Sequence, residues 1–258
     1  IADQLARSLQ LAVPPLTLST ACSSTANALV LGGTALEAAE YPAVLVAGLE
    51  ALSPVLIEGF RSLMLLDAAG SRPFDRRRDG MHLGEAAAVQ CLEPQARSRW
   101  RRRGRWLLAG AQVCAATGVA AQAPNADAMY TAMDRALSMA GVDIADVIAV
   151  KTHGLGSPDS DLAEARALQR LGGRMPLLTS LKGALGHTLG VSGVLETAVF
   201  GACLEAGFIP PAAGFVEPDP ELGVQPLTQA VAAQTGIYLL NFFGFGASYV
   251  SLVLGWYP

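Results

Sequence analysis

Apolar, β-branched runs alternate with alanine-rich segments along this chain, and that alternation restricts the fold more than any other feature. The first kind of segment has the length of a strand, and the second has helical length and opens on polar or small residues. Strands are predicted at 16–20, 43–47, 86–92, 106–113, 147–152, 177–179, 237–241 and 249–254. Helices are predicted at 23–39, 127–140, 160–171 and 189–205. The pattern indicates an α/β fold whose central strands are buried on both faces.

The composition supports broad burial without a membrane span. Hydrophobic residues make up 52% of the 258 positions, which is enough for a sizeable core. A membrane-spanning helix needs about 20 predominantly apolar residues, and the longer apolar stretches are interrupted by Glu37, Glu40, Glu50, Glu196 and Glu205. The segments 67–80 and 208–226 are rich in turn-forming residues, and we predict that both are loops.

Charge and cysteine content restrict the partners and the compartment. The formal net charge of -4 argues against a general nucleic-acid binder, which needs a basic surface. The four cysteines show no CxxC spacing, so we predict neither a metal site nor a disulfide framework, and a reducing cytoplasm fits best. A local exception to the acidic character is a cluster of arginines, for which a solvated turn is the simplest interpretation: Arg97, Arg99, Arg101, Arg102, Arg103 and Arg105.

Cys22 stands in "STACSSTANAL", between a strand-like run and a helix of small residues. Its sulfur is therefore expected at a helix N-terminus, where the macrodipole and free N–H groups stabilise a thiolate. Such a cysteine is a candidate nucleophile. The alternative is a small buried residue at the start of a packed helix.

Two of the three histidines lie in glycine-rich loops beside predicted strands or helices. His153 is in "VKTHGLGSPDSD", and His187 is in "TSLKGALGHTLGVSGVLE", five residues after Lys182. Cysteine acyl chemistry needs nearby imidazoles as hydrogen-bond donors or bases, so these two are candidate partners of Cys22. The third, His82, has no matching role and is predicted to be a surface or structural residue.

Four blocks in this order, "STACSS", "THGLGSPDSD", "SLKGALGHTLGVSGVLE" and "NFFGFGASYVSLVLG", resemble the motifs of the β-ketoacyl-acyl carrier protein synthases. The resemblance extends over nearly the whole chain and is closer to discrete type II synthases than to modular ones. It implies a thiolase-like, layered α-β-α-β-α fold with an incomplete N-terminal half. Residues 1–115 would form the remainder of that half and carry the nucleophile, and residues 116–258 would form the C-terminal half with both histidines.

The resemblance also implies roles for individual residues. Cys22 would accept an acyl chain as a thioester, and His153 and His187 would bind the malonyl thioester carbonyl and promote decarboxylation. The resulting carbanion would extend a fatty acyl, polyene or polyketide chain by two carbons. Backbone N–H groups of Cys22 and Phe245 would form the oxyanion hole. Lys182 and Glu196 would support the histidines.

Further positions match the family with less specific roles or depart from it. Asp161 and Glu164 match acidic positions behind the first histidine. Phe60 and Phe245 resemble acyl-pocket or gate residues, although core aromatics would look the same. Leu155 and Ser157 stand where the family usually has threonines that bind the pantetheine arm, so carrier binding is expected to be altered. Ala86, Ala247 and Leu49 replace usual glycines.

The implied partners are an acyl carrier protein, whose phosphopantetheine carries the substrates, and a second subunit in a homodimer or a heterodimer with another ketosynthase. The arginine cluster is a candidate docking patch for the acidic carrier. No cofactor bound by the chain is expected.

Only 21 residues precede Cys22, fewer than in the family. Three explanations of this short N-terminal part remain open: a part omitted from the sequence, a naturally short member of the family, and a module excised from a longer synthase. The alternative function is a chain-length-factor-like partner that catalyses little; a degradative thiolase ranks third.

Overall fold

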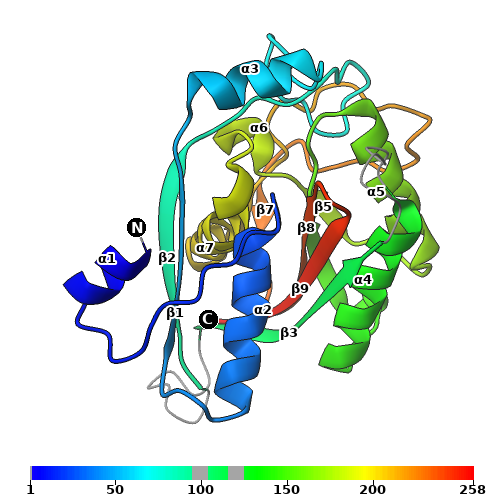
Figure 1. Ribbon diagram of the computed structural model, residues 1–258. Helices are drawn as coiled ribbons and strands as arrows, with labels where there is room; N and C mark the ends of the chain where they lie inside the picture. Colours follow the sequence, from blue (N-terminus) through cyan, green and yellow to red (C-terminus); the bar gives the residue numbers. More distant parts are fainter. Residues whose placement is uncertain (1, 95–103, 116–124) are drawn as a thin grey trace.

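The computed structural model describes residues 2–94, 104–115 and 125–258 (Figure 1). Its α-helices are α1 (Ala2–Ser8), α2 (Ser24–Glu37), α3 (Pro54–Ser62), α4 (Ala126–Ala140), α5 (Pro158–Arg170), α6 (Lys182–Leu185) and α7 (Ser192–Glu205). Its strands are β1 (Val44–Glu50), β2 (Ala86–Leu92), β3 (Gly104–Cys114), β4 (Val147–Lys151), β5 (Leu177–Thr179), β6 (Phe208–Ile209), β7 (Val231–Ala232), β8 (Gly236–Gly244) and β9 (Ser248–Tyr257). Within the described residues, no helix has the length and apolar character that crossing a membrane would require.

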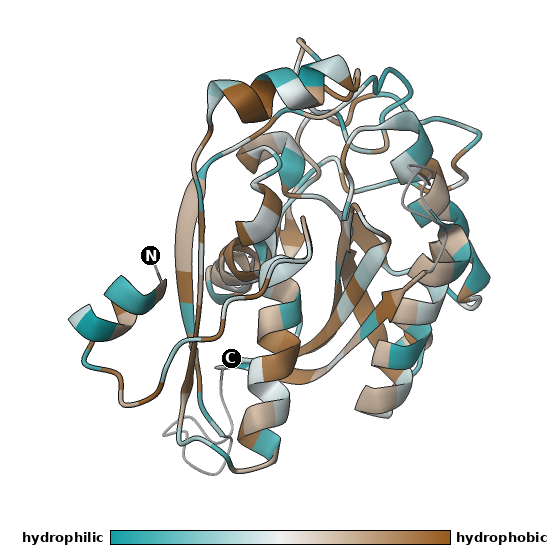
Figure 2. Cartoon of the chain, viewed as in Figure 1, coloured by the Kyte–Doolittle hydropathy of each residue, from teal (hydrophilic) through white to brown (hydrophobic). Residues whose placement is uncertain are grey.

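A five-stranded sheet in the order β3-β9-β8-β4-β5 lies at the centre of the molecule. β4 runs parallel to both β5 and β8, whereas β9 is antiparallel to both β8 and β3. The middle strands β8 and β9 are almost wholly buried, and brown hydrophobic stretches alternate with paler ones along them in Figure 2. β3, which the predicted division at residue 115 assigns to the first half, belongs to this sheet.

Helices cover both faces of the sheet and form two hydrophobic cores. On one face the cluster includes Met133 and Ala136 of α4 and Leu168 of α5. On the other face it includes Leu29 of α2 and Phe200 of α7. The antiparallel β1–β2 ribbon packs on the far side of α2 and α7, so the layers run helix, sheet, helix, ribbon (Figure 1). These are four of the five layers expected from the sequence, which confirms the mixed α/β class.

The outer face of the β1–β2 ribbon carries apolar side chains. Leu45, Leu49 and Val89 are 44%, 56% and 60% exposed. Strand alternation explains this pattern, because neighbouring residues point to opposite faces and the other face contacts α2 and α7. The second layer of helices that would cover this face in a five-layer fold has no counterpart here among the described residues.

Most predicted elements are confirmed within a few residues at their ends, and the two predicted loops are confirmed apart from the short strand β6. The strand predicted at 16–20 is wrong: only Thr20 forms a bridge, to Cys22, and Leu16 is 71% exposed. A strand requires a neighbour for its backbone hydrogen bonds, and none of the described strands runs beside this segment. Short elements were missed, namely α1, α3, α6, β6 and β7.

Candidate active site

Cys22 lies in a tight turn immediately before α2 and is 5% exposed. The turn passes through Ala21, whose φ of 50° lies in the left-handed region that residues with a side chain rarely adopt. Hydrogen bonds compensate for this conformation: Thr20 N donates to Ser24 Oγ at 2.8 Å, and Ser24 N donates to the Ala21 carbonyl at 3.1 Å. The turn therefore fixes the direction of the Cys22 side chain.

A buried polar network ties this turn to the start of β9. Ser23 Oγ donates to Ser248 Oγ at 2.8 Å, and Asn27 Nδ2 donates to Thr20 Oγ1 at 2.8 Å. The network joins residues more than 200 positions apart in the sequence, which is why the spacing of motifs gave no sign of it. Because Ser248 follows the 244–247 loop, the network holds the Cys22 turn and that loop together.

The 244–247 loop brings the Phe245 backbone to the sulfur of Cys22. A Cβ placed on Gly244 would lie 3.1 Å from Ser23 N and 3.2 Å from Cys22 N, so the close approach requires glycine. Gly246 also requires it, because its φ is 75°. The backbone N–H groups of Phe245 and Cys22 both act on the thiol, and each lowers its pKa. These are the two groups that the sequence predicted for an oxyanion hole.

Burial nevertheless dominates the ionisation of Cys22. Removal from water raises its pKa to about 11, because the thiolate loses solvation. The two backbone N–H groups and the Lys182 charge oppose this rise without cancelling it. The N–H groups at the helix start therefore favour a thiolate, as expected, but burial outweighs them, and with a pKa of about 11 Cys22 is a neutral thiol at pH 7.

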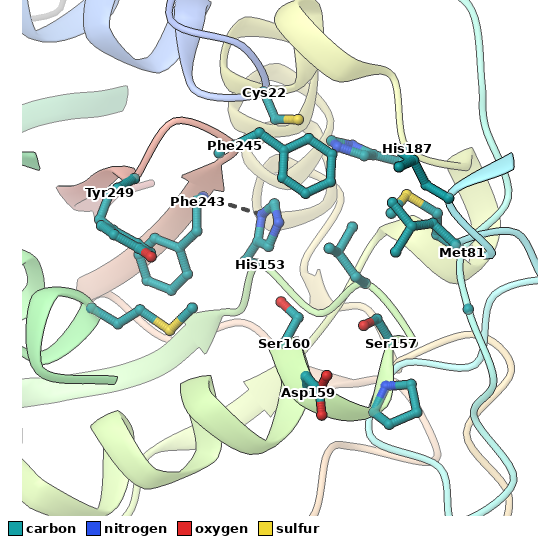
Figure 3. A pocket seen from close by; sticks show the side chains of 18 of the residues that line it. Cys22, Met81, His153, Ser157, Asp159, Ser160, His187, Phe243, Phe245 and Tyr249 are labelled. Atoms are coloured by element: carbon teal, nitrogen blue, oxygen red, sulfur yellow. Dashed lines mark hydrogen bonds between the residues drawn. The ribbon is translucent and has the colours of Figure 1, made fainter. Parts of the chain in front are cut away.

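His153 and His187 lie side by side at the same cavity (Figure 3). Their ring centroids are 5.8 Å apart with an interplanar angle of 89°. His153 follows β4, and its Nδ1 accepts a hydrogen bond from Phe243 N at 3.2 Å. That bond places the imidazole proton on Nε2, leaving an N–H donor for the cavity. His187 Nδ1 lies 3.3 Å from Ser192 Oγ at the start of α7.

Both imidazoles are neutral. Burial lowers the pKa of His153 and His187 well below the usual range, and the positive charge of Lys182 lowers both further. A neutral imidazole presents one donor and one acceptor. The pair can therefore bind an oxygen atom through N–H donors without supplying a full positive charge of its own.

Glu164 and Asp161 of α5 hold the loop that carries His153. Glu164 accepts hydrogen bonds from the backbone N–H groups of His153 and Gly154 at 2.8 and 2.9 Å. Asp161 accepts from Leu155 N at 2.9 Å and from Phe74 N at 2.7 Å. Burial raises the pKa of both carboxyl groups, to about 7 for Asp161. Both predicted acidic positions thus lie directly behind the first histidine.

A buried cluster of two lysines and one glutamate lies beside the histidines. Lys182 Nζ donates to Glu196 Oε1, and Lys151 Nζ donates to Glu196 Oε2 at 2.6 Å. Lys182 and Glu196 are the supporting pair that the sequence predicted. Lys151 was missed, although a lysine inside the apolar run "VIAVKTH", two residues before His153, was the available signal.

The cavity has a volume of about 650 Å³ and is lined by Cys22, both histidines, Leu155, Ser157 and Phe245 (Figure 3).

Other candidate residues lie outside the cavity. Phe60 does not line it, but the ring centroid of Phe60 is 6.0 Å from that of Phe245. The side chain of His82 does not line it either: its Nδ1 accepts from Ser71 N at 2.8 Å and its carbonyl accepts from His187 N, a structural role. Five arginines of the cluster lie outside the described residues, namely Arg97, Arg99, Arg101, Arg102 and Arg103, and the sixth, Arg105, pairs with Glu205. The part of the chain that the structure describes contains no cluster of three or more potential metal ligands.

Comparison with known proteins gives matches along most of the chain. Residues 1–98 match the N-terminal domain of β-ketoacyl synthases and residues 107–216 match the C-terminal domain. The 3-oxoacyl-[acyl-carrier-protein] synthase 2 of Mycobacterium bovis is 32% identical over 251 residues, covering 92% of this chain and 60% of that protein. The chain therefore spans about 60% of the length of this curated relative.

Solved structures agree with the sequence matches. The ishigamide ketosynthase/chain length factor aligns with a TM-score of 0.92 at 27% identity, covering 100% of this chain and 64% of that one. A chain of the complex between the ketosynthase ApeO and its chain length factor ApeC from Xenorhabdus doucetiae gives a TM-score of 0.87 at 30% identity, covering 99% of this chain and 63% of that one. With the thiolase-like layers, the ordered motifs and both family domains in place, this chain belongs to the β-ketoacyl synthase family.

Proposed function

We propose that the chain catalyses the decarboxylative condensation of malonyl-acyl carrier protein with an acyl group held on Cys22. The observation that carries this proposal is the convergence of Cys22, His153 and His187 on one cavity, with two backbone N–H groups directed at the sulfur. A nucleophile, an oxyanion hole and a pair of imidazole donors are the groups that the two half-reactions need.

In the first half-reaction, Cys22 Sγ attacks the thioester carbonyl of an acyl chain on the carrier's phosphopantetheine. The N–H groups of Cys22 and Phe245 stabilise the oxyanion that forms, and the thiol proton passes to the departing pantetheine sulfur. Because the pKa of Cys22 is about 11, the proton must leave as the carbon–sulfur bond forms. The acyl chain then occupies the cavity beside Phe245.

In the second half-reaction, the bond between the malonyl methylene and its carboxylate breaks, and CO₂ leaves. The electron pair forms an enolate, whose oxygen accepts hydrogen bonds from His153 and His187. The carbanion attacks the Cys22 thioester, and the carbon–sulfur bond breaks, so that Cys22 leaves as a thiolate and takes a proton from solvent to return to the thiol. The product stays on the carrier and is two carbons longer. Leu155 and Ser157 at the cavity would contact the pantetheine arm in place of the family's usual threonines.

The partners that fit this function are an acyl carrier protein and a second ketosynthase-type subunit. A chain-length-factor-like role is the second candidate, because the similar ApeO structure contains such a subunit as partner. The exposed apolar face of β1–β2 is compatible with either role. The presence of Cys22 and both histidines favours the catalytic one.

Intact-mass spectrometry tests the proposal. The purified chain is mixed with a short acyl-carrier protein, and its mass is compared with that of the Cys22→Ala variant. We expect a mass increase equal to the acyl group in the wild type and none in Cys22→Ala. Cys91→Ala is the matched control, because Cys91 is an exposed cysteine outside the cavity, and it should acylate like the wild type.

Release of CO₂ from malonyl-acyl carrier protein is then measured for the wild type. Acylation together with decarboxylation supports the condensing function. A folded chain that does neither contradicts it, and favours the chain-length-factor-like role if the chain binds a ketosynthase subunit in size-exclusion chromatography.

A further inference from the structure

Lys151 is a fully buried charged residue with no assigned role. It is the last residue of β4, two positions before His153. Its Nζ donates to Glu196 Oε2 at 2.6 Å and to the Asn241 carbonyl at 2.7 Å, and it lies 3.7 Å from the centre of the Phe242 ring. Burial lowers the pKa of Lys151 to about 8, and the charge of Glu196 opposes that shift, so the ammonium is mostly charged at pH 7. Its two hydrogen bonds and the cation–π contact fit a charged group.

Glu196 contacts two lysines. Its two oxygens each accept a hydrogen bond from a different buried lysine, Lys151 and Lys182, so two ammonium groups share one carboxylate. The carboxylate of Glu164 accepts hydrogen bonds from the backbone N–H groups of His153 and Gly154, and its charge acts on Lys151 without a direct hydrogen bond.

The positive charge of the two lysines acts on the histidine pair. Lys151 and Lys182 each lower the pKa of His153 and of His187, which shows that their fields reach both rings. A bonded path leads to the same place: Lys151 donates to Asn241, whose Nδ2 donates to Glu164 Oε1 at 2.9 Å, and Glu164 holds His153 N. A field that disfavours an imidazolium favours a negative charge on the group that the imidazoles bind.

We propose that Lys151 is a positioning residue of the decarboxylation step: with Lys182 it shares the Glu196 carboxylate, and the positive charge of the two lysines beside His153 and His187 stabilises the developing enolate of the extender thioester. This inference rests on the proposed condensing function. Lys151 does not line the cavity and does not touch the substrate, so its effect passes through the histidines and through charge.

The test compares the full-length Lys151→Gln variant with the wild type. Glutamine removes the charge and keeps an N–H donor for Asn241 or Glu196. Ser251→Ala is the matched control, because Ser251 Oγ donates to the same Asn241 at 2.9 Å and its loss changes no charge. We expect kcat for malonyl decarboxylation to fall about tenfold in Lys151→Gln. KM for the carrier and the acylation of Cys22 should stay at wild-type values, and Ser251→Ala should decarboxylate like the wild type.

A second readout does not depend on activity. In NMR titrations of protein labelled with ¹⁵N-histidine, the pKa of His153 and of His187 should rise in Lys151→Gln but not in Ser251→Ala, with His82 as the internal reference. Unchanged histidine titrations overturn the proposal, as does decarboxylation by Lys151→Gln within twofold of the wild type. An equal loss in Ser251→Ala also overturns it, because the role would then be structural. A wild type that neither acylates nor decarboxylates contradicts the proposed function instead, and the titrations still test the charge effect.

Discussion

Replacing Glu164 by glutamine tests whether the carboxylate behind His153 holds the catalytic loop. Glu164 Oε1 accepts from His153 N and Asn241 Nδ2, and Oε2 accepts from Gly154 N. A glutamine has only one acceptor oxygen, so its NH₂ group must face at least one of these donors. Placing the amide oxygen at the Oε1 position is the better orientation, because only the Gly154 N–H then loses its partner.

The magnitude follows from that single lost bond. Leaving one buried N–H without an acceptor costs about 1–3 kcal/mol. Burial raises the pKa of Glu164, so removing its charge recovers part of the desolvation cost. We therefore expect Glu164→Gln to lower the free energy of unfolding by about 1–2 kcal/mol. Because the affected loop carries His153, decarboxylation should fall by a larger factor than acylation of Cys22.

Urea unfolding and the two half-reaction assays measure these effects. Asp134→Asn is the control, since Asp134 is an exposed acid in the interior of α4 that does not line the cavity, and its change should alter the free energy of unfolding by less than about 0.5 kcal/mol. If Glu164→Gln were as stable as this control and decarboxylated at the wild-type rate, the loop would not depend on the carboxylate and the reasoning would be refuted.

Two further predictions concern Cys22 and the helix contact behind it. The rate of alkylation of Cys22 should rise about tenfold per pH unit between pH 7 and 10, because burial raises its pKa to about 11 and the thiolate fraction keeps growing over that range. The Cys22→Ala variant gives the background rate. A plateau of the rate near pH 8 would contradict the prediction. Gly193→Ala should lower the free energy of unfolding by about 1–3 kcal/mol or more, since a Cβ would lie 2.1 Å from Ala26 N of α2. Gly59→Ala on α3 is its control, because a Cβ there meets nothing within 4 Å and should leave stability unchanged or improved in the same denaturation assay.

The sequence predicted those parts of the fold that local patterns determine. The alternation of strands and helices has a periodicity that each segment displays by itself, and the cysteine and histidine motifs lie at the ends of such segments. The strand predicted at 16–20 was wrong because a strand also depends on a neighbour, which no local pattern reveals. The short elements α6, β6 and β7 have too few residues to show a period.

The groups that set the electrostatics of the site escaped the sequence analysis for a related reason. Lys151 shares Glu196 with Lys182 only because β4, α6 and α7 meet in the core, and the Ser23–Ser248 contact joins opposite ends of the chain. The neutral state of Cys22 was not predicted, since the helix start is visible in the sequence whereas the depth of burial is not. Desolvation then exceeds the local stabilisation of the thiolate.

Burial shifts the pKa of the cysteine and of the histidines in opposite directions, and this bears on how the proposed reaction would start. It raises the pKa of the Cys22 thiol and lowers the pKa of His153 and His187, so each group is held in its neutral form. A thiolate–imidazolium ion pair would require both shifts to be reversed. The free site therefore holds a neutral thiol beside two neutral imidazoles. In the proposed reaction, charge would develop only when a thioester oxygen reaches the backbone N–H groups or the histidines. Stabilisation would then be concentrated on the transition state, where it accelerates a reaction.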